Sequence, residues 1–246
     1  MSDQTNGGPT QSEKGYGQLH RRLLEGRGAV MAVATVVVIS IGGLVEIVPM
    51  FTTAAAEVPD WVTPYTPLEV AGRDIYVREG CYLCHSQWVR PMRSEVLRYG
   101  EWSRAAEYTY DRPFQFGSRR LGPDLHRVGG KYPDAWHYQH MEDPRSTSPG
   151  SVMPPYPWLL RDRIDPDDVQ ASVRALRRVG TPYSDADVEG VATSMQAQGN
   201  GIVQSLAAAG LETEWDREIV AVIAYLQRLG VEGREAVASG ATGEEP

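Results

Sequence analysis

One pentapeptide decides the fold of this chain: Cys81-Tyr82-Leu83-Cys84-His85. Two thiols three residues apart can each add to one vinyl group of a haem, and the adjacent His85 can then bind the iron. A thioredoxin-like redox motif would need a βαβ context, which the surrounding sequence lacks. A structural zinc site would need a second pair of ligands, and the chain has only two cysteines. The pentapeptide therefore predicts one covalently bound haem c, with His85 as the first axial ligand of the iron.

The second axial ligand must come from further along the chain, from a set of three methionines and three histidines: Met92, Met141, Met153, His126, His137 and His140. Met92 follows His85 too closely to reach the opposite face of a haem. Met153 lies in a loop that three prolines stiffen, and such a loop can hold a thioether at the iron. Met141 lies in a helix-like segment, where methionine usually fills the core. We expect Met153 to be the ligand, with Met141 and His140 as alternatives, and the remaining histidines to be hydrogen-bonded structural residues. A His/Met pair is typical of a low-spin, electron-transferring haem.

An uncharged apolar run begins at Gly28 and continues, interrupted only by Glu46, to Phe51. It predicts one transmembrane helix over residues 29–51. Three arginines precede the run and two acidic residues follow it, so the positive-inside rule leaves residues 1–28 in the cytoplasm and exports the rest. A signal peptide cleaved at the alanines 54–56 is the alternative, but its apolar region would be shorter. Glu46 is expected either to reach water at the interface or to contact another subunit.

The exported part is predicted to be all-helical. A Thr66 cap, Pro67 and Glu69 indicate a helix start, and this helix ends near Gly80. Residues 81–160 are rich in glycine, proline and aromatics and favour loops with short helices. Amphipathic patterns predict further helices over 167–179, 184–209 and 214–229, the last capped by Thr213. The predicted organisation is a linker at 52–63, a haem-binding domain at 64–230 and a frayed tail at 231–246. The formal net charge of −8 argues against nucleic acid as a partner.

Several longer motifs resemble the monohaem cytochrome c subunit (subunit II) of cbb3-type cytochrome c oxidases. They are residues 42–49, 79–91, 98–101, 110–118, 122–125, 128–132, 136–137, 153–158 and 224–230. The resemblance covers roughly residues 18–230. The sequence departs from the familiar pattern at Trp88-Val89 and Met92, where that pattern has Met-Ile and Phe.

The resemblance implies a class I cytochrome c-like domain, enlarged by a helical insertion at 165–210 and anchored by one transmembrane helix in the bacterial inner membrane, with the haem in the periplasm. It implies an electron-transfer subunit that receives electrons from a dihaem sister subunit and passes them to haem b of a catalytic subunit. That catalytic subunit also holds the haem b3–copper centre, where oxygen is reduced, so this chain has no catalytic residues of its own. Cys81, Cys84, His85 and Met153 would hold the haem.

Two other functions are consistent with the motif alone. A free-standing, membrane-anchored cytochrome c could shuttle electrons between complexes, and a haem peroxidase or sensor would need an open axial position on the iron. One or two of the arginines near the motif could pair with the haem propionates, and the alternative is that they are ordinary surface residues: Arg90, Arg93, Arg119 and Arg120. Gly122-Pro123 is expected to form a turn beside His85, and the helix at 214–229 is expected to cross the helix before Cys81.

Overall fold

The computed structural model describes residues 21–22, 26–53, 58–117 and 119–241 of the chain. It divides into two compact units, Met1–Glu57 and Val58–Pro246. Across the described residues the regular elements are helices, and the only β-type pairing is one isolated bridge between Arg163 and Arg217. The prediction of an all-helical protein is confirmed.

The first unit contains helix α2, Gly28–Thr53, where the apolar run predicted a helix over 29–51. Its stretch Gly28–Pro49 has 22 residues, is long and apolar enough to cross a membrane, and has no part buried inside the protein. At 1.5 Å per residue the stretch is about 33 Å long, close to the roughly 30 Å of a bilayer's hydrocarbon core. Residues 54–56, the alternative cleavage site, lie outside the described residues.

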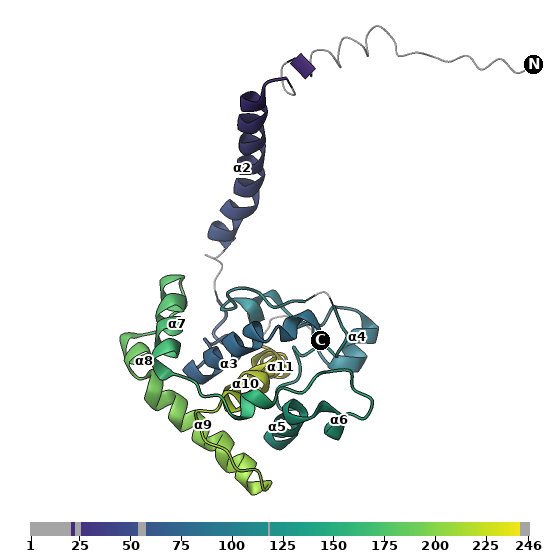
Figure 1. Ribbon diagram of the computed structural model, residues 1–246, viewed down its shortest axis with the longest axis vertical. Coiled ribbons are helices and arrows are strands. Elements are labelled where there is room, and N and C mark those ends of the chain that lie inside the picture. The colour runs from purple at the N-terminus through teal and green to yellow at the C-terminus, as the bar shows by residue number, and fades with distance from the viewer. Residues whose placement is uncertain (1–20, 23–25, 54–57, 118, 242–246) are drawn as a thin grey trace, which may run out of the picture. The chain divides into compact units, whose positions relative to one another are not determined.

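The centre of the second unit is the crossing of helices α3, Pro67–Arg78, and α10, Glu218–Arg228 (Figure 1). The predicted capping box is present: Thr66 Oγ1 accepts from Glu69 N, and the Glu69 carboxylate accepts from Thr66 N. The two backbones are so close that a Cβ atom on Gly72 would lie 2.0 Å from the carbonyl oxygen of Ala221. The expected crossing of these two helices is confirmed, and it buries an apolar stripe that runs along α10.

Helix α10 begins four residues later than predicted, with Arg217 and not Thr213 at its N-cap. The chain before it turns at residues 215–216 and then pairs with the 162–164 segment: Ile164 N donates to Asp216 O, and Glu218 N donates to Asp162 O. The amphipathic pattern alone could not show this tertiary pairing.

The predicted insertion forms three helices, α7 (Pro166–Arg178), α8 (Asp185–Glu189) and α9 (Val191–Ala208). The pattern predicted α8 and α9 as one helix, but the chain breaks at Gly190. Helices α7 and α9 pack on α3, and α9 also packs on α10, with Val173, Met195 and Leu206 completely buried. The insertion therefore enlarges the core on one side of the α3–α10 pair (Figure 1).

The C-terminal prediction of a frayed end is wrong for residues 231–238, which form helix α11, Val231–Ala238. Glu232 accepts a hydrogen bond from the backbone N–H of Thr63, and Gly233 lies directly under the carboxylate of Glu107. The remaining short helices lie in the loop-rich region: η2 (Cys81–Leu83), α4 (Arg93–Tyr99), η3 (Ala105–Tyr108), α5 (Asp134–Glu142), α6 (Pro144–Thr147) and η4 (Pro157–Leu160).

Candidate haem site

The two cysteines lie on one short turn directly after α3. Gly80 has a φ of 70°, a left-handed conformation that suits glycine, and it lets the chain leave the helix and enter η2. In a 3₁₀ turn the side chains at positions i and i+3 are eclipsed, so Cys81 and Cys84 lie on the same side. Burial raises the pKa of the Cys81 thiol to about 12. The turn therefore presents two thiols together, as attachment to one haem requires.

The His85 ring is held in one orientation by the segment that follows residue 121. Its Nδ1 atom lies 2.8 Å from the carbonyl oxygen of Pro123. A carbonyl can only accept, so Nδ1 carries the proton and the lone pair of Nε2 is free for a metal. Burial lowers the pKa of His85, which keeps the imidazole neutral. A Cβ atom on Gly122 would lie 2.1 Å from His85 Cε1, so the predicted packing role of Gly122-Pro123 beside His85 is confirmed.

A cavity of about 530 Å³ opens beside this turn, and Cys81, Cys84, His85 and Met153 all line it. Its walls come from the motif, the 121–132 segment, α5, the loop at 148–156 and α10. This volume falls within the roughly 300–1,000 Å³ that is usual for ligand and cofactor pockets. The structure thus brings together the four residues that the sequence selected, although they are spread over more than seventy positions.

The alternative ligands have different surroundings. Met92 is 50% exposed and is not among the residues that line the cavity. Met141 lines the cavity but is also buried in the hydrophobic core, as expected for a core methionine. His140 lines the cavity too, and its Nδ1 is 2.6 Å from Thr147 Oγ1. His126 is enclosed in a buried network away from the lining, with Ser103 at Nδ1 and Asp124 accepting from its backbone N–H.

Asp124 links the segment that positions His85 to the residues that follow the C-x-x-C-H motif. Its carboxylate accepts from Ser86 Oγ at 2.6 Å, from Trp88 N at 2.8 Å and from His126 N at 2.9 Å. Asp124 belongs to the motif at 122–125, but a single aspartate in a sequence gives no sign of its partners.

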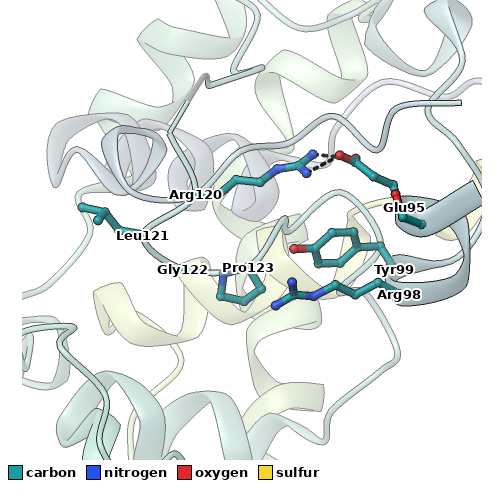
Figure 2. Close-up of a pocket in the computed structure, with 8 residues that line it drawn as sticks. Glu95, Arg98, Tyr99, Arg120, Leu121, Gly122 and Pro123 are labelled. Atoms are coloured by element: carbon teal, nitrogen blue, oxygen red, sulfur yellow. Dashed lines mark hydrogen bonds and ion pairs between the residues drawn. The ribbon is translucent and has the colours of Figure 1, made fainter. Parts of the chain in front are cut away.

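A second hollow of about 340 Å³ adjoins the cavity, with which it shares Tyr99, Leu121, Gly122 and Pro123. Figure 2 shows the Arg120 guanidinium reaching the carboxylate of Glu95 on α4, beside Gly122 and Pro123. Hydrogen bonds from Arg120, and then from Arg90, lower the pKa of Glu95 to about 2. This ion pair ties α4 to the segment that positions His85.

The prediction that nearby arginines pair with haem propionates is not supported. Arg90 and Arg120 are both bound to Glu95, and neither they nor Arg93 and Arg119 are among the residues lining the cavity. The cations that do line the cavity are Arg127 and Lys131. Arg127 is fixed by Glu107 through two hydrogen bonds of 2.6 and 2.8 Å.

The fit of a haem to these residues can be judged from the site itself. Two thiols lie on one turn, a neutral histidine has a free Nε2, and methionines and aromatic rings line the rest of the cavity. These features define a c-type cytochrome domain, built on crossed N- and C-terminal helices and accompanied by an apolar helix that can anchor a chain in a membrane.

Comparison with protein families identifies the kind of cytochrome. The family described as "Cytochrome C oxidase, mono-heme subunit/FixO" matches residues 20–232. The chain therefore belongs to the mono-haem subunits of cbb3-type cytochrome c oxidases, and it is an electron-transfer subunit of that complex. Membership implies one haem c and argues against a free-standing shuttle, a peroxidase or a sensor. None of the curated proteins compared with the chain matches it.

Proposed function

We propose that Cys81, Cys84, His85 and Met153 hold the single haem c of this oxidase subunit, on the periplasmic side of the inner membrane. When bound, haem c supplies a one-electron iron couple through which electrons from the dihaem sister subunit pass towards haem b of the catalytic subunit. The observation that carries the proposal is that the four residues line one cavity.

His85 acts as the fixed proximal ligand in this proposal. The carbonyl of Pro123 accepts its Nδ1–H, which sets the tautomer and makes Nε2 more basic. Gly122 leaves room for the ring, and Asp124 and the Arg120–Glu95 pair hold the supporting segment in place. A ligand held this rigidly needs little rearrangement when the iron changes its charge.

Met153 is favoured over Met141 and His140 as the distal ligand. It is half-buried in the loop between α6 and η4. Prolines stiffen this loop, and bonds from Ser151 N to Ser148 O, from Tyr156 N to Met141 O and from Met153 N to Ser151 Oγ hold it. Met141 is buried in the core between α5 and its neighbours, and Nδ1 of His140 is within hydrogen-bond distance of Thr147 Oγ1. A thioether ligand favours the reduced iron and so raises the reduction potential.

The exported side follows from charge. Arg21, Arg22 and Arg27 precede α2, and Glu57 and Asp60 follow it, which by the positive-inside rule directs residues 58–246 out of the cytoplasm. Covalent attachment of haem to a C-x-x-C-H motif takes place on that same side, so the topology and the site chemistry support one another.

The test combines covalent haem staining with purification of the oxidase in mild detergent. The wild-type subunit should stain for covalent haem and co-purify with haem b and copper. Cys81→Ala/Cys84→Ala should abolish the staining, while Leu83→Ala should keep it because Leu83 lies between the cysteines and is 56% exposed. Normal staining in the double cysteine variant would overturn the assignment.

A further inference from the structure

His137 differs from the other described histidines outside the C-x-x-C-H motif. The Nδ1 atoms of His126 and His140 each lie within hydrogen-bond distance of a hydroxyl group. His137 is only 1% exposed, yet its Nε2 atom is buried without any hydrogen-bond partner. An unsatisfied buried polar group destabilises the folded protein, so one that persists calls for an explanation.

The surroundings of His137 point to the haem cavity. His137 lies on α5 and lines that cavity together with Met141 and Met153. The rings of Tyr132 and Trp136 pack edge-on against it, with centroids at 6.2 and 5.4 Å, so neither ring satisfies Nε2. Burial lowers the pKa of His137 to about 4, which leaves the imidazole neutral with a single N–H to donate.

The chemistry of a haem limits what that N–H can meet. The macrocycle is apolar at its edges except for two propionate carboxylates, which are strong acceptors. The axial positions belong to His85 and Met153 under the proposed function, on which this inference rests. Arg127 and Lys131, the two cations of the lining, lie in the segment that leads into Tyr132 and α5. The cations of the lining thus lie on the 127–140 wall together with His137 and His140, and an anion would be favoured there.

We propose that His137 positions the haem by donating a hydrogen bond from Nε2 to a propionate carboxylate. The neutral imidazole satisfies the carboxylate without adding a charge to a buried site. Its position is fixed by the stacked rings of Tyr132 and Trp136, which both pack edge-on against it, and by α5, which packs on α10. His137 is therefore a positioning residue, and loss of its N–H should leave the haem attached but change the surroundings of one propionate.

Two variants in the assembled oxidase separate this role from simple packing. His137→Phe keeps a flat ring against the stacked Tyr132 and Trp136 but has no N–H, whereas His137→Gln keeps a donor. The matched control is Gln139→Leu, a polar-to-apolar change at an exposed position of the same helix. Resonance Raman spectra of haem c report the propionate bending modes, and an optical redox titration reports its midpoint potential.

We expect the propionate modes to shift in His137→Phe and to return towards the wild-type position in His137→Gln, with Gln139→Leu unchanged. The midpoint potential should fall in His137→Phe, because a less satisfied carboxylate favours the oxidised iron. Unchanged propionate modes in His137→Phe, with covalent haem and a low-spin spectrum intact, would overturn the proposal. So would a change confined to the methionine–iron band. Both results leave the proposed function standing, because that function depends on haem staining.

If His137→Phe does not retain haem, His137→Asn is used in its place. The asparagine side chain is shorter than that of glutamine, so its N–H does not reach the position of Nε2. A propionate shift in His137→Asn that His137→Gln reverses would support the proposal. Identical spectra for His137→Asn and the wild type would overturn it.

Discussion

The imidazole of His85 lies directly against the Cα atom of Gly122, where any Cβ atom would come within 2.1 Å of Cε1. The next residue, Pro123, accepts the Nδ1 proton of the same ring. One dipeptide thus fixes both the orientation and the tautomer of His85, the proposed proximal ligand, and no larger residue fits at position 122 without moving the ring.

Gly122→Ala should therefore weaken the site from its proximal side. The added methyl group must displace the His85 ring or the segment that carries it, and overpacking of this kind costs roughly 1–3 kcal/mol. We expect lower thermal stability and a smaller fraction of low-spin haem, measured by absorption of the purified full-length subunit.

The control for this variant is Gly201→Ala, in the middle of α9. A Cβ atom there would meet nothing within 4 Å, so alanine should be neutral or stabilise the protein by about 0.5–1 kcal/mol. A wild-type spectrum and melting temperature for Gly122→Ala would contradict the close packing against His85.

Much of this site can be predicted from local sequence, because most of its candidate residues lie in short motifs. The pentapeptide at 81–85 contains both thiols and the proposed first ligand, and a proline-rich loop favours Met153 as the second. What the sequence could not show is which distant charges meet. Arg120 is close to the motif along the chain, yet it binds Glu95, while Arg127 and Lys131 line the cavity. The unsatisfied nitrogen of His137 is likewise visible only once its neighbours are in place.

Met153→Ala should leave the haem covalently attached, because the thioethers and His85 remain. The midpoint potential should fall, since the thioether ligand that favours reduced iron is lost. Optical redox titration of haem c, together with the methionine–iron charge-transfer band of the oxidised protein, measures both effects.

Met141→Leu is the matched control, because it removes the other thioether of the lining while conserving side-chain volume. It should keep the charge-transfer band and the potential. If Met141→Leu loses the band and Met153→Ala keeps it, the distal ligand is Met141. If both keep it, the assignment of a methionine ligand to either residue fails.

Glu95 should make stability depend on pH in the acid range. Arg120 and Arg90 hold its folded pKa at about 2, whereas an unfolded glutamate titrates near about 4.3. Because the folded pKa is the lower one, the stabilisation is fully present above the unfolded value and is lost as the pH falls towards about 2. Melting temperatures of the wild type and Glu95→Gln, measured from neutral to acid pH, should therefore converge below about pH 4.

The comparison with Glu95→Gln isolates the effect of the Glu95 charge on stability, since glutamine resembles the protonated acid and cannot titrate. A constant difference between the two melting curves at every pH would show that the charge of Glu95 contributes nothing. Since Arg120 precedes Leu121 and Gly122, the low-spin haem signal should weaken over the same pH interval in the wild type.

Helix features with a local sequence signal were predicted, and those set by distant contacts were not. The Thr66 capping box and the apolar stripe of α10 are local signals, and both helices were predicted. The start of α10 was predicted four residues too early, because residues 216–218 pair with the 162–164 segment. Helix α11 was missed because its composition is typical of a tail, while its order comes from contacts such as Glu232 with Thr63.

The last prediction concerns the apolar helix α2. Gly42 and Gly43 present bare backbone, since a Cβ atom at either position would meet nothing within 4 Å in this chain. Small residues let transmembrane helices approach closely, and an acid such as Glu46 within an apolar span tends to face a protein partner. We expect α2 to be a structural part of the oxidase and not only an anchor.

Gly42→Leu/Gly43→Leu should then release the subunit from the oxidase on detergent extraction, because the added side chains block close approach of a partner helix. Val37→Leu/Val38→Leu, on the same helix, should leave it bound, and both results can be read from co-purification of covalent haem with haem b and copper. Replacement of residues 29–51 by an unrelated apolar helix of equal length should have the same effect as the glycine double variant. If that chimera stays bound and supports full oxidase turnover, α2 is an anchor only, and recognition of the partner subunits belongs to residues 58–246.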